Sequence, residues 1–214
     1  MSAENATYYP GVPLRGYMDA AASSAPAPGG GSVSATVGAL GAALVSMVCN
    51  LTLGKEKFAA LEGQVKELVE QAEQLRRELI LLLQNDTTAY NGVIAAYRLP
   101  KETDDEKAAR HAAVQEGLIH AADVPLDICR AAVRVCRLAK TAAEIGNPAA
   151  VTDAGCAALF GEAAAQGAAL NVEINLGSIE DEAYKRAAAG EVALILSEAA
   201  DLRTEVLKTT REKL

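Results

Sequence analysis

Asp86 is the residue of this sequence whose type and position most clearly indicate chemistry. Apolar residues recur at a helical spacing over residues 61–82, and the same spacing continues to Tyr90 and Tyr97. Asp86 falls on that stripe, where an apolar side chain is expected. Burial would raise the pKa of its carboxyl group, which suits proton transfer or recognition of an amidine-like pair of N–H groups. The alternative is a helix that emerges into solvent at this point, with a hydrated carboxylate.

A glycine-rich turn before a predicted helix is the second candidate feature. The stretch PAPGGGSVSA places Gly29, Gly30 and Gly31 after a proline, with Ser32 at the helix start. Such a turn exposes backbone N–H groups, and the helix dipole favours an anion there. The spacing matches neither the dinucleotide motif nor the phosphate loop. A flexible linker with Ser32 as the N-cap is the alternative interpretation.

Polar side chains at three further places are candidates for binding. Asn91 lies next to the stripe of Asp86, and Asn171 and Asn175 share one helix face because they are four residues apart. Asp153 follows the turn GNPAAVT, where an N-cap is its simplest role. If one helix runs from Asp153 to Asn171, about 27 Å separates the two residues at 1.5 Å per residue, so they cannot contact the same substrate atom.

Composition predicts one domain over residues 1–214, built from helices. Half of the 214 residues are hydrophobic but only 4% are aromatic, so the core must consist of closely packed small and aliphatic side chains. The net charge of −8 disfavours nucleic acid and anionic membranes as partners, because both reward basic surfaces. A small molecule or another protein is therefore the expected partner.

The cysteines and the N-terminus indicate a cytoplasmic protein without a metal site. The four cysteines lack C-x-x-C spacing, and both histidines lie in a charged stretch away from them. Reduced thiols are therefore expected. The first residues, MSAENATYYPG, lack a basic segment followed by an apolar core, so they do not resemble a signal peptide.

Helical periodicity in every long segment predicts an all-α bundle of six or seven helices with a long central helix pair. One long helix is expected over about 56–98, and another begins at the capping box of Thr103 and Glu106 and restarts or kinks near Pro125. The uncharged stretch 33–53 is long enough to span a bilayer. Its serine, threonine and asparagine residues favour a core helix instead, and its glycines suggest close approach by other backbones.

Five ordered blocks of the sequence resemble one known family. They are ASSAPAPGGGSVSATVGALGAALVSMVCNLTLGKEKF, LPKETDDEKAAR, VPLDI, GNPAAVTDAG and ALNVEIN. The resemblance is to the cyclodeaminase/cyclohydrolase family, which includes the cyclodeaminase domain of formiminotransferase-cyclodeaminase and free-standing bacterial methenyltetrahydrofolate cyclohydrolases. It covers roughly residues 20–205. It implies an all-helical fold, a homodimer and a tetrahydrofolate substrate, with no metal or redox cofactor.

The resemblance favours the cyclohydrolase reaction. The absence of a formiminotransferase half, together with the block ALVSMVCNLTLGK, indicates conversion of 5,10-methenyltetrahydrofolate and water to 10-formyltetrahydrofolate. The cyclodeaminase reaction, from 5-formiminotetrahydrofolate to 5,10-methenyltetrahydrofolate and ammonia, fits the same blocks and is the first alternative. A non-catalytic dimeric helical module, whose glycine-rich loop docks a partner, is the second.

The resemblance also suggests roles for individual residues. Asp86 is the expected catalytic residue, since a proton must reach N5 as the ring opens, although a carboxylate could instead bind the cationic substrate. The glycine-rich loop would line the pocket mouth, and Lys55 and Lys57 would contact the glutamate carboxylates. The expected substrate-binding residues are Gly29, Gly30, Gly31, Ser32, Lys55, Asn91, Asn147, Asp153, Asn171 and Asn175.

Overall fold

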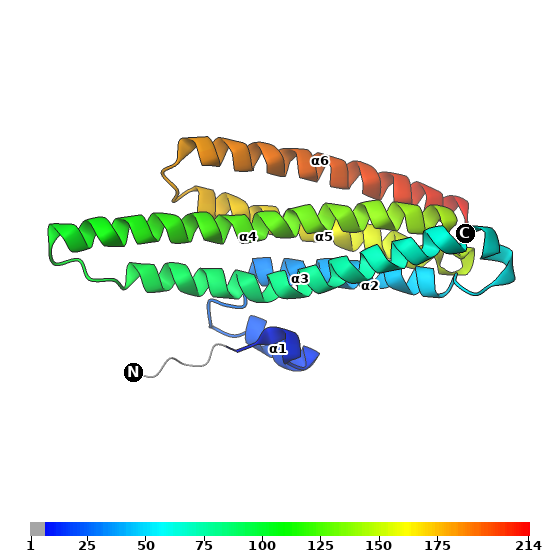
Figure 1. Cartoon of the computed structure of the whole chain (residues 1–214), viewed down its shortest axis with the longest axis horizontal. Helices are drawn as coiled ribbons and strands as arrows, with labels where there is room; N and C mark the ends of the chain where they lie inside the picture. The colour runs from blue at the N-terminus through cyan, green and yellow to red at the C-terminus, as the bar shows by residue number, and fades with distance from the viewer. Residues whose placement is uncertain (1–6) are drawn as a thin grey trace.

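The fold is all-α, as predicted. A computed structural model describes residues 7–214, and no strand occurs among them. Within these residues, six α-helices and three short 3₁₀-helices follow one another (Figure 1). Their bounds are η1 (Tyr9–Gly11), α1 (Leu14–Ala21), α2 (Gly30–Asn50), η2 (Glu56–Leu61), α3 (Glu62–Tyr97), α4 (Asp104–Ile145), η3 (Pro148–Ala150), α5 (Val151–Leu176) and α6 (Glu182–Glu212). The first half of the segment MSAENATYYPG lies outside the described residues.

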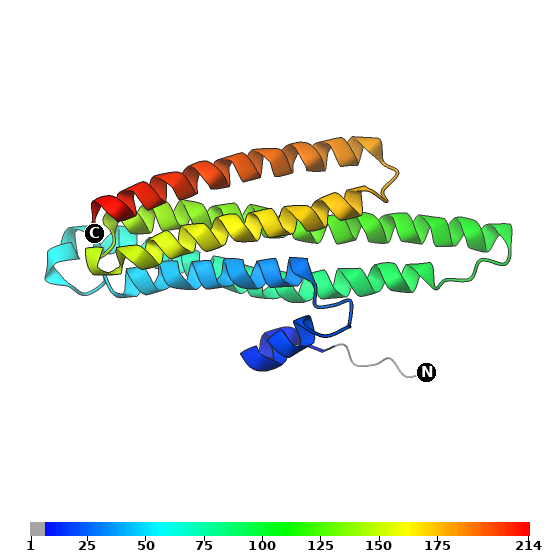
Figure 2. The ribbon, with the colours of Figure 1, turned by 180° about the vertical axis from the view of Figure 1, so that it is seen from behind.

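Helices α2, α3, α4 and α5 form an elongated bundle. The long helices α3 and α4 are neighbours, and α2 and α5 pack against them and against each other (Figures 1 and 2). Helix α6 covers α4 and α5 on one side, while α1 lies outside the bundle on another. Both α3 and α4 extend beyond the start of α2 and the end of α5. This end of the bundle therefore has two helices fewer than the middle.

Helix α2 is a core helix whose glycines allow close packing. A Cβ atom on Gly38 would lie 3.2 Å from Leu79, and one on Gly41 would lie 3.1 Å from the carbonyl oxygen of Ala157. By length and composition α2 is the one helix of residues 7–214 that could cross a membrane, yet most of it is buried inside the bundle. The expectation of a core helix approached closely by other backbones is confirmed.

Several helix ends differ from the predicted ones. The capping box at Thr103 is confirmed. Ser32 is not an N-cap, because α2 begins at Gly30 after Gly29. Asp153 is not an N-cap either, since α5 begins at Val151 and Asp153 lies in its first turn. A negative charge there interacts favourably with the helix dipole. The N-cap of α6 is Asp181, whose side chain accepts hydrogen bonds from two backbone N–H groups.

Helix α4 continues through Pro125 rather than restarting there. Proline has no N–H group, so it cannot donate to the carbonyl oxygen of Ala121 one turn earlier. The side chain of Asn175, on α5, donates to that oxygen at 2.7 Å. A neighbouring helix thus supplies the hydrogen bond that the proline removes.

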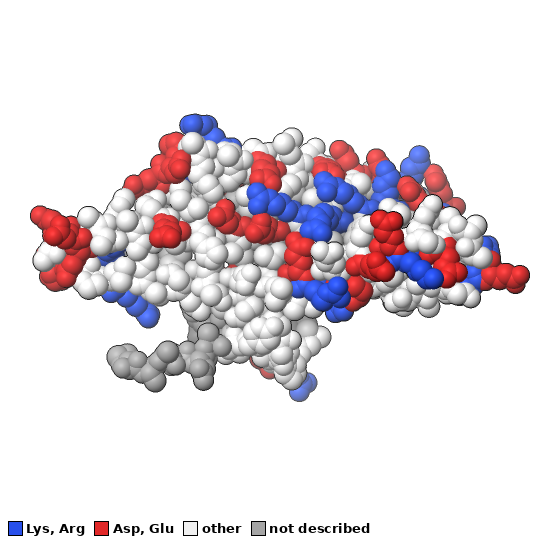
Figure 3. All heavy atoms as spheres, viewed as in Figure 1, with Lys and Arg blue, Asp and Glu red and all other residues white. Residues whose placement is uncertain are grey.

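Ion pairs fix the position of α6 along α4. Charged side chains of both signs gather over these two helices in Figure 3. Three pairs at distances of 2.6 Å link them: Arg130 with Glu191, Arg137 with Glu198 and Lys140 with Glu205. Since the three glutamates are seven residues apart, they lie on one face of α6. Each pair is partly exposed, so the pairs set the register more than they add stability.

Close packing between α4 and α5 predicts a contrast between two glycines. A Cβ atom on Gly161 would lie 2.6 Å from the sulfur of Cys136 and 3.0 Å from a backbone oxygen, whereas one on Gly190 of α6 meets nothing within 4 Å. We expect Gly161→Ala to lower the free energy of unfolding by about 1–3 kcal/mol. Gly190→Ala is the control and should raise it by up to about 1 kcal/mol. Urea unfolding of both variants measures this, and equal effects would contradict the packing.

Candidate functional site

The carboxyl group of Asp86 lies against the first turn of α2. The backbone N–H of Ser32 donates to Asp86 Oδ2 at 2.9 Å, so a side chain of α3 satisfies one of the free N–H groups of the helix start. Gly31 makes this approach possible, because a Cβ atom there would collide with the carboxylate. The glycine-rich turn is thus required by close contact with Asp86, and the linker interpretation is wrong for Gly31.

Burial raises the pKa of Asp86 above its usual range. The side chain is half-buried, and removal from water disfavours its charged form. The hydrogen bond from Ser32 lowers the pKa but does not outweigh burial. The interpretation of Asp86 as a hydrated residue on an exposed face is therefore wrong. A carboxyl group whose pKa is raised in this way is better suited to holding and releasing a proton than an ordinary carboxylate.

A hydrogen-bond network between α1 and α2 stabilises the first turn of α2. The hydroxyl groups of Tyr17 and Ser32 are 2.9 Å apart, and the Thr36 hydroxyl lies within hydrogen-bond distance of the Tyr17 hydroxyl, at 3.2 Å, and of the Ser32 carbonyl oxygen, at 3.1 Å. Tyr17 is the buried residue of α1. The Ser32 side chain is therefore occupied within the protein, and its backbone is the part that contacts Asp86. No periodic pattern could have identified Tyr17, because α1 is only two turns long.

A cavity of about 460 Å³ opens beside Asp86, at the end of the bundle where α2 begins and α5 ends. Its walls come from the turn before α2, from α3 and α4, and from the last turns of α5. The stripe that predicted Asp86 continues along it through Tyr90, Val93 and Tyr97. The described lining residues are Pro26, Ala27, Gly29, Gly30, Asp86, Tyr90, Val93, Ile94, Tyr97, Leu118, Ala121, Asn171, Ile174, Asn175 and Ser178.

Two asparagines on α5 line this cavity. The Nδ2 of Asn171 donates to a carbonyl oxygen of its own helix, and that of Asn175 donates to the carbonyl oxygens of Ala121 and Asn171. Both N–H groups of Asn175 and one of Asn171 are used in this way, and neither Oδ1 receives a hydrogen bond from the described residues, so each can accept one. Gly30 lies close by, since a Cβ atom on it would be 3.1 Å from Asn171 Nδ2. The site can therefore accept hydrogen bonds from a ligand that carries N–H groups.

The structure brings some of the predicted site residues together and separates others. Gly29, Gly30, Asp86, Asn171 and Asn175 line the cavity, whereas Gly31 and Ser32 are buried behind Asp86 and Asn91 is exposed outside it.

Three predicted binding residues lie at the opposite end of α2. Lys55 is exposed after the helix ends, Asn147 caps η3, and Asp153 lies in the first turn of α5. Helix α2 is about 30 Å long at 1.5 Å per residue. Within one chain these residues are therefore too far from Asp86 to contact the same small molecule. Asn147 is engaged by its own surroundings, since it donates to the carbonyl oxygen of Leu51.

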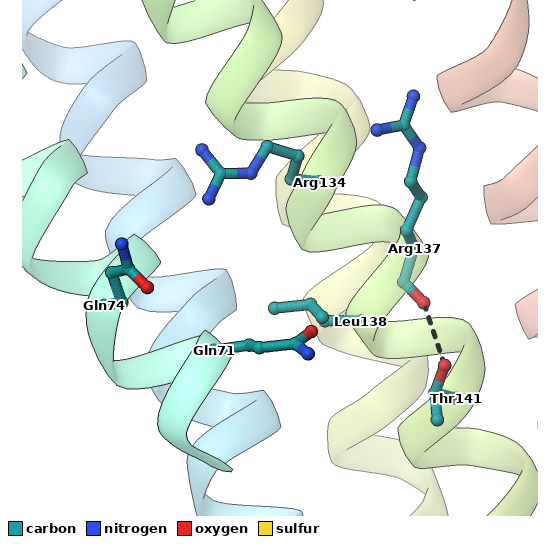
Figure 4. Close-up of a pocket in the computed structure, with 6 residues that line it drawn as sticks. All are labelled: Gln71, Gln74, Arg134, Arg137, Leu138 and Thr141. Atoms are coloured by element: carbon teal, nitrogen blue, oxygen red, sulfur yellow. Dashed lines mark hydrogen bonds between the residues drawn. The ribbon is translucent and has the colours of Figure 1, made fainter. Parts of the chain in front are cut away.

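A second hollow between α3 and α4 is polar and has paired arginines (Figure 4). Arg134 points across it and binds Glu78 at 2.8 Å, while Arg137 points away from it and binds Glu198. Gln71, Gln74, Leu138 and Thr141 complete the lining. Because both arginines already form ion pairs with glutamates, this hollow has no unpaired arginine to bind an anionic ligand. The described residues also contain no group of three or more potential metal ligands.

Comparison with known proteins assigns the family. Residues 13–194 match the family described as Formiminotransferase-cyclodeaminase. The chain belongs to this family. It is 46% identical to the methenyltetrahydrofolate cyclohydrolase of Methylorubrum extorquens over 197 residues, which are 92% of this chain and 95% of that protein.

More distant members of the formiminotransferase-cyclodeaminase family agree with this. The chain is 38% identical to the formimidoyltransferase-cyclodeaminase of Gallus gallus, over 87% of this chain but only 35% of that longer protein. The crystal structure of formiminotetrahydrofolate cyclodeaminase from Thermotoga maritima superposes with a TM-score of 0.84 at 30% identity, covering 94% of this chain and 96% of that one. The resemblance found in the sequence is confirmed.

The raised pKa of Asp86 predicts a pH-dependent gain in stability when its charge is removed. Below the ordinary carboxyl pKa of about 4, Asp86 is neutral in the folded and unfolded chain, so ionisation costs nothing. As the pH rises through its raised pKa, the folded chain must ionise a half-buried group and loses stability. We expect Asp86→Asn to melt at a higher temperature than the unchanged protein at pH 7, with the difference vanishing toward pH 4. A variant that melts lower at pH 7 would show that the Ser32 hydrogen bond outweighs burial.

Proposed function

We propose that the chain is a methenyltetrahydrofolate cyclohydrolase, which hydrolyses 5,10-methenyltetrahydrofolate to 10-formyltetrahydrofolate, and that Asp86 is its catalytic residue. The similarity to the Methylorubrum extorquens enzyme over nearly the full length of both chains supports the reaction. The observation that carries the site is a carboxyl group with a raised pKa at the wall of a cavity that also holds two aromatic side chains. No metal or cofactor takes part in the proposed reaction.

The cavity suits a cationic, aromatic substrate. The amidinium carbon of 5,10-methenyltetrahydrofolate is already electrophilic, so water can add to it when a nearby base removes a proton. Asp86 takes that proton, and delivers it to N5 as the bond between N5 and the carbon breaks. The proton of the added hydroxyl group leaves to solvent, and the formyl group stays on N10. The Oδ1 atoms of Asn171 and Asn175 would accept hydrogen bonds from the N–H groups of the pterin ring.

The cyclodeaminase reaction is the alternative function. The solved Thermotoga maritima structure carries that name and shares the fold of this chain. In 5-formiminotetrahydrofolate, N10 attacks the same carbon and ammonia leaves. This reaction needs a proton to pass from N10 to the departing nitrogen, so a carboxyl group in the same cavity would serve it. Turnover of the two substrates by one preparation separates the functions, because one reaction consumes the absorbance of the methenyl group and the other produces it.

Removal of the Asp86 charge should affect the chemical step. We expect Asp86→Asn to lower kcat by about 10²–10⁴ while KM changes only a few-fold, because the amide keeps the shape of the carboxyl group but cannot move a proton. Decay of the methenyl absorbance measures both constants. Asp201→Asn, the same substitution at an exposed position of α6, is the control and should leave them unchanged. Full activity of Asp86→Asn would remove this residue from the mechanism.

We further propose that the chain forms a homodimer through one apolar face. The face consists of exposed side chains on the neighbouring helices α2 and α5, which lie side by side in Figure 2. Leu40 is 54% exposed and Ile174 is 74% exposed, although both are strongly apolar. Helix α2 carries no charged residue along its whole length. The remaining members of the face are Val33, Met47, Leu159, Phe160 and Leu170, together with Leu51 directly after α2.

A second copy of the chain is the occupant that such a face suits. Exposed apolar patches of this kind are rare on monomers, and a two-fold axis lets one patch cover itself. The same assembly would cover most of the exposed surface of α2. This agrees with the proposal that the protein is cytoplasmic and binds neither a membrane nor nucleic acid. We also propose that residues 1–214 act as one domain.

A charge on this face should separate the subunits. Leu40→Glu is expected to convert a species of about twice 22.2 kDa into one of 22.2 kDa, because burying an unpaired carboxylate in the interface is costly. Leu194→Glu places the same charge on α6, where the side chain is 74% exposed, and should leave the dimer intact. Sedimentation equilibrium at micromolar concentration measures both. A monomeric unchanged protein, or an intact Leu40→Glu dimer, would contradict the proposed interface.

A further inference from the structure

The cavity beside Asp86 contains no cationic side chain, although the proposed substrate ends in an anionic glutamate. None of its described lining residues is lysine or arginine. Lys55, expected from the sequence to contact the glutamate, lies beyond the far end of α2. A different cation must therefore meet the carboxylates if the chain recognises this part of the substrate.

Arg110 on α4 contacts Tyr97, a residue of the cavity wall. Its Nε donates to the carbonyl oxygen of Tyr97 at 3.1 Å, and its guanidinium lies 5.6 Å from the centre of the Tyr97 ring. Tyr97 itself lines the cavity. Stacking on an aromatic ring fixes the plane of a guanidinium group without using its terminal N–H groups. The two terminal nitrogens of Arg110 have no acceptor among the described residues, so they remain available to a ligand.

The position of Arg110 matches the shape of the substrate. Asp86 and Tyr97 lie on one stripe of α3 and are about 16 Å apart along it at 1.5 Å per residue. In a folate, the p-aminobenzoyl group separates the reacting carbon from the glutamate, so the two ends of the molecule need binding sites at two ends of an elongated cavity. Tyr90 lies between them on the same stripe and offers an aromatic surface to the middle of the substrate.

We propose that Arg110 binds the glutamate carboxylates of the substrate and so determines the preference for folates over analogues without glutamate. The inference rests on the proposed function. A planar guanidinium with two unused terminal nitrogens is suited to a bidentate contact with a carboxylate. Tyr97 acts here as a positioning residue, since it holds the guanidinium in place.

The test compares two substrates in variants of the full chain. One is 5,10-methenyltetrahydrofolate, and the other is 5,10-methenyltetrahydropteroate, which lacks the glutamate. Arg110→Gln is expected to raise KM for the first about 10- to 100-fold, the range for loss of a hydrogen bond to a charged group, while KM for the second and kcat for both stay unchanged. Lys107→Gln, one turn earlier on α4 and paired with Asp104, removes the same charge and should change neither substrate.

Each other outcome has a defined meaning. An equal rise of KM for both substrates, or equal KM values for the two substrates in the unchanged protein, would overturn the role of Arg110 while leaving the cyclohydrolase function intact. A glutamate-specific loss in Lys55→Gln instead of Arg110→Gln would assign the carboxylates to Lys55 of a neighbouring copy and would also overturn it. Failure of the unchanged protein to hydrolyse either substrate would refute the proposed function itself.

Discussion

The contact between the Asp86 carboxyl group and the first turn of α2 is the constraint on which the site depends. It fixes where an uncharged core helix begins relative to α3, and it requires glycine at position 31 because any side chain there would displace the carboxylate. Burial at this place raises the pKa of Asp86, and the hydrogen bond from Ser32 only partly offsets that rise. One arrangement of backbone and side chain thus gives both the register of the bundle and a group suited to proton transfer.

The cavity exists because the helices of the bundle have unequal lengths. Helices α3 and α4 continue past the start of α2, so the space that α2 fills elsewhere is open beside Asp86. Pro125 would weaken α4 near this opening, but Asn175, which lines the cavity, supplies the missing hydrogen bond. The side chain of Asn175 thus both completes the hydrogen bonding of α4 and lines the cavity.

Periodicity predicted the all-α fold and identified Asp86, because a helical stripe reports which residues share a face. The same stripe contained Tyr90 and Tyr97, whose place on the cavity wall could have been inferred from it. Sequence spacing does not report how far α2 slides along α3, so it could not tell that Lys55 and Asp153 lie at the other end of the bundle. Arg110 was missed for the same reason, since its contact with Tyr97 depends on the pairing of α3 with α4.

The pH dependence of a single turnover tests the central claim most directly. In a stopped-flow experiment with enzyme in excess, decay of the methenyl absorbance should follow the ionisation of one group with a pKa above the usual carboxyl range of about 4, because Asp86 must be able to accept a proton. This inflection should be absent from Asp86→Asn after subtraction of the uncatalysed reaction. If the same inflection persists in Asp86→Asn, another group moves the proton and the account of the site is wrong.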